Sequence, residues 1–227
     1  MSTLVVLQPS YLPWLGYFDQ MAKANAFVLY DDVQFDKHGW RNRNRIKSPK
    51  GPLWLTVPVL HTGRAPQSIN SVEIDGRRPW AEKHLRSIEQ SYARAPFRNS
   101  SLPGLSKILL QPWKRLVDLN IATTKWLAEE FAITTPLYRS SALAIEGDRN
   151  ERLINFCRHF GATRYISGDA ARAYLDVEAF AAAGIEVIWH SYRHPEYPQL
   201  HGAFVPQLSA IDLLLNLGPS ARTLFMK

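Results

Sequence analysis

The sequence predicts an α/β fold with a mostly parallel sheet flanked by helices, and three successive patterns near the N-terminus predict it. A short apolar run, Thr3 to Leu7, ends at a turn that contains two prolines. Apolar residues then recur at helical spacing from Trp14 to Ala22, and a second apolar run covers Ala26 to Tyr30. A strand, a helix and a strand in this order form a βαβ unit, which has parallel strands and a right-handed crossover.

The last third of the chain returns to the same alternation. Asp148, with Glu151 three residues later, is typical of a capping box and predicts the start of a helix. The other elements expected here are strands at Arg164–Ser167 and Glu186–Tyr192, a short helix opened by Asp176, and a final helix, Ala210–Leu217, that Ser209 caps and Gly218 ends.

The stretch from Asp31 to Val59 predicts both an inserted β-hairpin and a site. Residues 41–46 alternate along an extended strand, so three arginines share one face while two asparagines and an isoleucine share the other. Ser48–Gly51 fits a turn, and Leu53–Val59 fits a returning strand whose alternate residues, beginning with Leu53, face the core. Guanidinium groups in a row repel one another unless water or an anion neutralises them. We therefore expect an anion-binding site; the alternative is an edge hairpin with a solvated cationic face.

A helical segment is expected after the hairpin. One helix is opened by Pro79, and a longer one runs from about Pro112 to Ala132. Residues 96–106 between them are rich in helix breakers and are expected to form a loop. We expect one α/β domain over residues 1–227, with a helical subdomain at about 79–132.

The composition is that of an ordinary globular protein with an excess of basic residues. Lys and Arg number 27 against 20 Asp and Glu, a net charge of +7. This balance favours an anionic partner but does not choose among nucleic acid, acidic lipid, nucleotide and carrier-protein phosphate. The single cysteine, Cys157, rules out an internal disulfide and is expected to be a buried hydrophobe. No apolar run approaches the roughly 20 residues of a membrane span and no signal peptide is evident, which predicts a cytoplasmic protein.

Polar loops follow several of the expected strands. Ligands of parallel sheets bind beyond the carboxyl ends of the strands, where Gln8–Pro13 and Asp31–Lys37 both fall. A third polar loop, His194–Gln199, follows the last strand and is stiffened by two prolines. We expect this loop to face the Asp31–Lys37 loop across one cleft. His38 lies near carboxylates, where it would serve as a general acid or base; the alternative is a solvated loop histidine.

Six short runs extend this picture to nearly the whole chain. They are QPSYLPWLGYFD (8–19), DDVQ (31–34), WRNRNRI (40–46), WLTVP (54–58), HPEY (194–197) and LSAIDLLLN (208–216). In these runs the chain resembles the WbqC-like family. The resemblance implies that the gene lies among genes for O-antigen and other surface polysaccharides. For some members of the family a glycine (aminoacyl) transferase role has been suggested. It implies no catalytic residues, because none are established for the family.

The opening strand, turn, helix and second strand also resemble nucleotidylyltransferase-like α/β enzymes, which have a Rossmann-like architecture. The strand Tyr165–Ser167 with the following Gly168, and the helix after Ser209, stand where those enzymes place nucleotide contacts. Those enzymes carry an HxGH-type motif after the first strand, whereas Pro13-Trp-Leu-Gly16 offers no histidine. The resemblance therefore implies an architecture and an anion or nucleotide pocket, without the imidazoles that stabilise phosphate.

These observations predict an enzyme of surface-polysaccharide (O-antigen) biosynthesis that transfers an acyl or aminoacyl (glycyl) group to a sugar or sugar nucleotide. The alternatives are a nucleotidyltransferase-like enzyme and a non-catalytic module that binds nucleotide or RNA. The residues expected in catalysis are Asp32, Lys37, His38 and His194. Those expected to bind substrate are Gln8, Tyr11, Trp14, Gln34, Trp40, Arg41, Asn42, Arg43, Arg45, Tyr197 and Gln199.

The expected partner is a small anionic substrate such as a sugar nucleotide, with an acyl carrier protein as a second candidate. The donor would be activated by phosphopantetheine or by a nucleotide, and the reaction needs no metal. Nucleic acid is not expected, because the cationic run is short and no known RNA-binding motif accompanies it.

Overall fold

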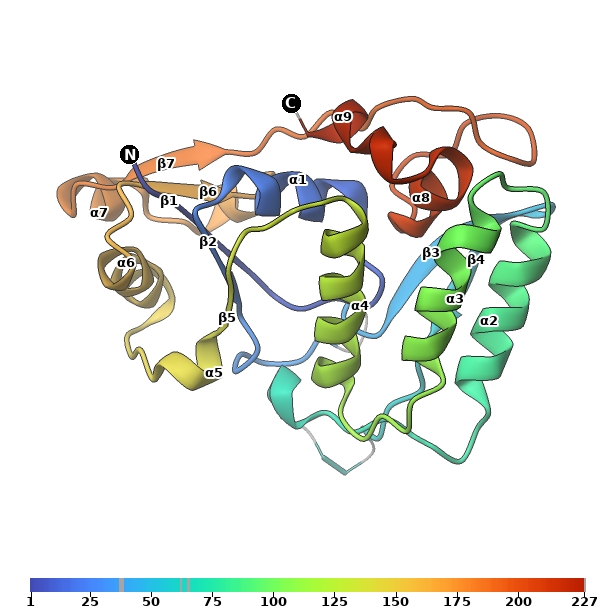
Figure 1. The fold of residues 1–227 in the computed structure, drawn as a ribbon. Helices are drawn as coiled ribbons and strands as arrows, with labels where there is room; N and C mark the ends of the chain where they lie inside the picture. Colours follow the sequence, from blue (N-terminus) through green and yellow to red (C-terminus); the bar gives the residue numbers. More distant parts are fainter. Residues whose placement is uncertain (37–38, 62, 65, 227) are drawn as a thin grey trace.

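The computed structural model describes residues 1–36, 39–61, 63–64 and 66–226. A five-stranded parallel sheet with the order β5-β2-β1-β6-β7 forms its centre (Figure 1). The strands are β1 (Thr3–Leu7), β2 (Ala26–Leu29), β5 (Leu137–Arg139), β6 (Arg164–Ser167) and β7 (Glu186–Trp189). The expected α/β fold, with parallel strands flanked by helices, is confirmed, and so is the βαβ unit at its start.

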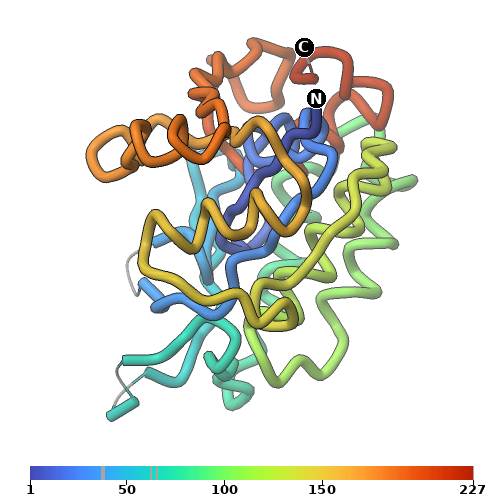
Figure 2. The backbone as a smooth tube through the Cα atoms, turned by 90° about the vertical axis from the view of Figure 1, so that its left-hand side faces the viewer, coloured from blue at the N-terminus to red at the C-terminus, as the bar shows by residue number. Residues whose placement is uncertain are grey.

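Helices cover both faces of this sheet, which explains why its strands are apolar on both sides. Val5 packs in the cluster beneath α1 (Leu15–Lys23). Its neighbour Leu4 points to the opposite face and packs in the cluster beneath α6 (Arg149–His159) and α7 (Val177–Ala182). In Figure 2, which shows the left side of Figure 1, α6 lies in front of the central strands.

Two of the three expected helix caps are confirmed. Asp148 forms the capping box that opens α6, and the Asp176 side chain accepts a hydrogen bond from the backbone of α7. The third differs in part, because α8 (Ile211–Leu217) has Ala210 rather than Ser209 at its N-cap position, although the Ser209 hydroxyl still accepts a hydrogen bond from the N–H of Ile211 at 3.4 Å. The backbone N–H of Ser209 also donates to the carbonyl of Arg45 at 2.9 Å, which joins the start of α8 to the hairpin.

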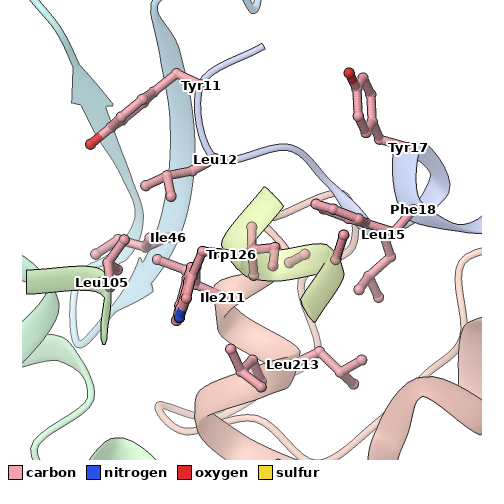
Figure 3. Packing of buried hydrophobic residues seen from close by; sticks show 14 of the residues in the cluster. Tyr11, Leu12, Leu15, Tyr17, Phe18, Ile46, Leu105, Trp126, Ile211 and Leu213 are labelled. Carbon is pink, nitrogen blue, oxygen red and sulfur yellow. The ribbon is translucent and has the colours of Figure 1, made fainter. Parts of the chain in front are cut away.

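The chain between β2 and β5 forms a second layer beside the sheet. One apolar cluster joins the two layers, and Figure 3 shows Phe18 of α1, Ile46 of the hairpin and Trp126 within it. The elements of this insertion are β3 (Arg43–Ser48), β4 (Gly51–Thr56), the 3-10 turn η1 (Ile69–Ser71), α2 (Trp80–Ser91), α3 (Arg98–Leu109) and α4 (Leu116–Glu130).

The expectation of a loop at residues 96–106 is wrong, because this part of the chain forms most of α3. Leu105 is buried, and packing of its face of the helix outweighs the helix-breaking effect of Pro103. A Cβ atom on Gly104 would lie 2.8 Å from Nε1 of Trp126, so glycine allows α3 to approach α4 closely. The breakers therefore mark a close helix contact rather than a loop.

The β-hairpin is confirmed, and its returning strand is only partly as expected. Leu55 and Val57 are buried, but Leu53 is 37% exposed. Leu53 lies beside the turn on β4, whereas α2 and α8 pack mainly against β3, so its side chain is left near the free end of the hairpin.

Several short elements carry no clear sequence pattern and were not expected. They are β5, α5 (Ser140–Leu143), η2 (Asp169–Ala173), η3 (Pro219–Ala221) and α9 (Arg222–Phe225). Cys157 is fully buried as expected, and burial raises the pKa of its thiol to about 12. Within the described part of the chain, none of the helices combines the length and apolarity needed for a bilayer crossing.

Candidate functional site

The order of the strands contains one point where the chain reverses its direction across the sheet. From β1 the chain moves to β2 and β5 on one side, and from β6 it moves to β7 on the other. The loops that leave β1 at Gln8 and β6 at Gly168 therefore diverge, and open α/β sheets bind ligands at such a point. Two cavities border it.

The first, cavity A, has a volume of about 330 Å³ and lies between the loop after β1, the start of α1 and the segment before β3. It brings together four of the residues expected to bind substrate, although they come from separate parts of the chain. The lining residues are Leu7, Gln8, Ser10, Pro13, Trp14, Tyr17, Gln20, Trp40, Arg41, Asn44 and Gln207.

Three lining side chains of cavity A have buried polar atoms without a hydrogen-bond partner among the described residues. They are the hydroxyl of Tyr17, Oε1 of Gln20 and Nε of Arg41. Arg41 is held by a bond from Nη1 to the carbonyl of Gln8 at 3.1 Å, which leaves Nε available. Buried polar groups are nearly always satisfied, so unpartnered donors and acceptors around one cavity indicate a ligand or bound water.

Burial also shifts the pKa values of these groups. It lowers the pKa of Arg41, although Tyr17 and Asp36 partly oppose the shift. It raises the pKa of Tyr17 well above its usual range. The phenol is therefore a neutral hydrogen-bond donor, and the guanidinium is a cation partly removed from water, whose attraction for an anion is strengthened by the lower local dielectric.

The second cavity, cavity B, has a volume of about 500 Å³ and lies over the carboxyl ends of β1 and β6. It shares Leu7, Gln8 and Arg41 with cavity A, so we treat the two as one cleft, the Gln8–Arg41 cleft. Its lining residues are Val6, Leu7, Gln8, Tyr30, Arg41, Arg149, Leu153, Tyr165, Ser167, Gly168, Ala170, Ala171, Tyr174 and Leu175.

Arg43 and Arg45 lie outside this cleft, on the outer face of the hairpin. The guanidinium of Arg43 lies 4.8 Å from the ring centre of Trp54, and that of Arg45 lies within 5.6 Å of both Trp54 and Trp40. The three arginines share one face of the strand, but only Arg41 lines the cavities. Stacking on indole rings is favourable for a guanidinium, so the other two contribute an exposed aromatic and cationic surface.

Asn42 and Tyr11 belong to the core rather than to the cleft. The Asn42 amide donates to the carbonyl of Val57 at 2.9 Å and holds the two hairpin strands together. Tyr11 has no exposed surface, and its hydroxyl is hydrogen-bonded to Nδ1 of His84 at 2.9 Å. The expectation that Tyr11 stacks on a substrate is thus corrected. The Gln8–Pro13 loop does lie at the carboxyl end of β1, but α2 covers the Tyr11 side chain through His84.

The acidic turn after β2 is neutralised by residues from distant parts of the chain. Asp31 is fully buried and accepts hydrogen bonds from Arg139 Nε at 2.7 Å and from the hydroxyl and N–H of Ser141 at 2.9 and 3.0 Å. Asp32 lies 2.5 Å from Nη2 of Arg152 and 2.7 Å from the hydroxyl of Ser140. Both oxygens of Asp32 are thus held by internal partners, so this geometry favours a structural role for Asp32.

None of the other described residues of the Asp31–Lys37 loop lines the cleft. Gln34 is exposed and forms an isolated bridge with Ser68. Lys37 and His38 lie outside the described residues, so their proposed catalytic roles stay predictions. His38 precedes Trp40 of cavity A by two positions in the sequence.

The loop after β7 packs against α8. Tyr197 and Gln199 both donate to Asp212, at 2.8 and 2.9 Å, and Tyr92 donates to the other oxygen of the same carboxylate at 2.7 Å. The ring of His194 lies between Tyr197 and other aromatic residues, and burial lowers its pKa. Their bonds to Asp212 engage Tyr197 and Gln199, and we assign these two to the fold instead of to substrate binding. Nδ1 of His194 lies 3.0 Å from the carbonyl of Pro195, whereas its Nε2 is buried without a hydrogen-bond partner among the described residues, so the proposed catalytic role of His194 stays a prediction.

The structure does not place the two loop clusters in one cleft. Asp32 pairs with α6, and Tyr197 pairs with α8, at opposite ends of the molecule in Figure 1. The physical reason is the path of the chain after β7. It leaves the edge of the sheet and crosses to the hairpin, so Tyr197 and Gln199 lie against α8 and not beside the Asp31–Lys37 loop.

Sequence reasoning missed Tyr17 and Gln20, which lie three residues apart on one face of α1. The available signal was their position in the first helix after β1, because the loop that leads into this helix leaves the central strand, where ligands bind. It also missed a buried pair, His190 and Asp19, whose Nε2 and Oδ2 atoms are 2.5 Å apart. His190 directly follows the edge strand β7. Its bond to Asp19 therefore joins α1, the helix that carries Tyr17 and Gln20, to the end of that strand.

The fold and the site define an α/β protein with a polar, partly cationic cleft at the switch point of a parallel sheet. The chain belongs to the WbqC-like protein family, which it matches over residues 8–224. It is also 39% identical over 223 residues to the uncharacterized protein Rv1507c of Mycobacterium tuberculosis (strain ATCC 25618 / H37Rv), covering 97% of this chain and 96% of that protein. No solved structure matches the chain.

Proposed function

We propose that this protein is a transferase that binds an anionic, sugar-bearing substrate in the Gln8–Arg41 cleft. The group transferred is acyl or aminoacyl (glycyl), the acceptor is a sugar or sugar nucleotide, and the pathway is surface-polysaccharide (O-antigen) synthesis. The reaction class and the pathway come from the family resemblance. The observation that carries the binding site is the set of unpartnered atoms on Tyr17, Gln20 and Arg41 around one cavity.

The chemistry of cavity A fits a sugar that carries negative charge. Arg41 Nε donates to a phosphate or carboxylate oxygen, a charge-assisted bond stronger than a neutral one. Tyr17 donates to a sugar hydroxyl and Gln20 Oε1 accepts from one. Trp14 and Trp40 supply the apolar surface on which a sugar ring packs. Such contacts fix the acceptor hydroxyl or amine for attack on the donor carbonyl, and the bond from that carbonyl to the phosphopantetheine thiol or to the nucleotide phosphate breaks as the new ester or amide forms. His38 remains the candidate for taking its proton.

A second candidate function is a non-catalytic module that binds RNA. The observation that favours it is the outer face of the hairpin, where Arg43 and Arg45 stack on Trp54, whose side chain is 45% exposed. Exposed aromatic rings beside guanidinium groups are the surface on which unpaired bases stack. This face lies outside the cleft and would not need Arg41.

Thermal unfolding with single ligands tests the proposal. Sugar nucleotides, sugar phosphates, coenzyme A, amino acids and an oligouridine are added separately, and the midpoint rises with any ligand that binds the native state. We expect shifts from sugar nucleotides or sugar phosphates that vanish in Arg41→Met. Arg77→Met is the matched control, because the Arg77 side chain is 81% exposed and lines neither cavity.

The variants also separate the two candidates. An oligouridine shift that Arg45→Met abolishes and Arg41→Met leaves intact, with no shift from any sugar nucleotide or sugar phosphate, would support the RNA-binding module and contradict the transferase. For a sugar ligand that does bind, mass spectrometry after incubation with glycyl or acyl donors should find the acceptor heavier by the transferred group. An unmodified acceptor with every donor would contradict the transfer reaction.

A further inference from the structure

The two cavities of the Gln8–Arg41 cleft differ in size and in chemistry. Cavity A, at about 330 Å³, has indole faces and unpartnered hydroxyl and amide groups. Cavity B, at about 500 Å³, is larger and lies at the switch point itself. A single ligand that occupied both would need a compact polar part, a larger part with a flat ring, and a connection at the shared residues.

The shared residues supply the chemistry of an anionic connection. Arg41 and Gln8 line both cavities, and the bond from Arg41 Nη1 to the Gln8 carbonyl fixes the guanidinium where the cavities meet. Its unpartnered Nε is a donor for phosphate oxygens at that junction. A pyrophosphate is the group that joins a sugar to a nucleoside, and a guanidinium binds it well.

Cavity B supplies a surface for a flat ring and a second cation. Tyr174 lines it with a side chain that is 50% exposed, and the guanidinium of Arg149 lies 5.9 Å from the centre of its ring. Tyr30 lines the same cavity, at the end of β2. The loop at Ser167 and Gly168 brings backbone groups to the carboxyl end of β6, where open α/β sheets bind nucleotides.

We infer that the ligand of this cleft is a nucleoside-diphosphate sugar, with its nucleoside in cavity B, its pyrophosphate at Arg41 and its sugar in cavity A. The inference rests on the proposed function and narrows it, since it names the acceptor as a sugar nucleotide rather than a free sugar. A nucleoside is larger than a hexose and carries the flat base, so it matches the larger, tyrosine-lined cavity.

Isothermal titration tests the inference with three kinds of ligand. These are the nucleoside diphosphates UDP, ADP, GDP and dTDP, the sugar phosphate glucose 1-phosphate, and the glucose adduct of whichever diphosphate binds most tightly. The adduct should bind more tightly than either part. Tyr174→Ala should weaken the diphosphate and the adduct about tenfold, as loss of one stacking contact does, and leave glucose 1-phosphate unchanged. Gln20→Ala should weaken glucose 1-phosphate and the adduct, and leave the diphosphate unchanged.

Tyr138→Ala is the matched control for Tyr174→Ala. Tyr138 is also exposed, at 38%, but it lines neither cavity, so this variant should bind every ligand as the wild type does. Folding of each variant is checked by its unfolding midpoint. Diphosphate binding that is unaffected in a folded Tyr174→Ala variant, or an adduct that binds no better than its diphosphate, would overturn the inference.

Failure here and failure of the proposed function give different results. If glucose 1-phosphate binds through Gln20 and none of the four diphosphates binds, the nucleoside assignment is overturned and the proposed function stands. If the adduct binds through both Tyr174 and Gln20 but is recovered unmodified after incubation with acyl and glycyl donors, the nucleotide assignment stands and the transfer reaction is contradicted.

Discussion

The acidic turn after β2 and the cleft after β1 leave neighbouring strands of the sheet, and both are rich in polar side chains. They differ in how those side chains are satisfied. Asp31 and Asp32 are saturated by Arg139, Arg152 and two serines. In the cleft, by contrast, Tyr17, Gln20 and Arg41 each keep a buried polar atom without a partner among the described residues.

This difference separates a polar cluster that stabilises the fold from one that is available to a ligand. The acidic turn has the denser charge in the sequence, and charge density alone suggested a catalytic role for it. Hydrogen-bond saturation is the better criterion, because a group whose partners are all internal has little left to offer a substrate. The predictions below test this contrast, beginning with the largest expected effect.

Removing the charge of Asp31 should destabilise the protein strongly. In Asp31→Asn the buried oxygen that meets Arg139 is lost or becomes neutral, and breaking a buried ion pair costs about 3–5 kcal/mol. Urea unfolding at neutral pH measures the change. Asp118→Asn is the control, since Asp118 is half-exposed and meets the same arginine at 3.4 Å, so it should cost less than about 1 kcal/mol. A loss below about 1 kcal/mol for Asp31→Asn would mean that the turn is not needed for the fold.

Low pH should reduce the free energy of unfolding through protonation of His84, which helps to hold the loop after β1. Burial lowers the pKa of His84 to about 4, and its ring holds Tyr11 in the Gln8–Pro13 loop. The unfolded chain takes up this proton near pH 6.5 and the folded chain near pH 4, so stability is complete above pH 6.5 and falls between those values. The loss is about 3 kcal/mol.

Urea unfolding of the wild type and His84→Asn across that range measures this contribution. Asparagine keeps a polar group near the position of Nδ1 and cannot titrate. The difference in unfolding free energy between the two proteins should shrink as the pH falls towards 4. A difference that is constant with pH would show that His84 does not titrate in this range.

Two tyrosines should respond in opposite ways to loss of the hydroxyl. Tyr17→Phe removes a buried hydroxyl without a partner among the described residues, so it should stabilise the protein by about 1 kcal/mol while weakening the ligand of cavity A. Tyr92→Phe removes a bond to Asp212 and should destabilise by about 1–3 kcal/mol. Unfolding free energies and ligand affinities of both variants decide this. Equal destabilisation would mean that Tyr17 is satisfied internally and would remove it from the site.

The smallest expected effect is that of Asp32→Asn on turnover. Asp32 is engaged by Arg152 and Ser140 and does not line the cleft, so kcat and KM should each stay within about twofold of the wild type, well under 1 kcal/mol. A large fall in kcat with KM unchanged would instead restore Asp32 as the proton acceptor. Arg152→Met is the companion variant, since it frees the same carboxylate and should raise kcat only if Asp32 is a base.

The sequence by itself determined the class of the fold and the faces of its elements. Period-two and helical patterns are set by neighbours along the chain, so β1, α1 and β2 were predicted, as was the capping box at Asp148. The same local rule put the arginines and asparagines of residues 41–46 on opposite faces, which the burial of Asn42 and Asn44 confirms.

The tertiary structure decided which polar residues face a cavity. Asp31 finds Arg139 108 positions along the chain, and Asp32 finds Arg152 120 positions along, and no local pattern encodes such distances. In the same way, only the fold shows that Arg41 lies between two cavities while Arg45 stacks on tryptophans outside them. A side chain's role depends on which distant groups satisfy its hydrogen bonds, and those groups are brought to it only when the chain folds.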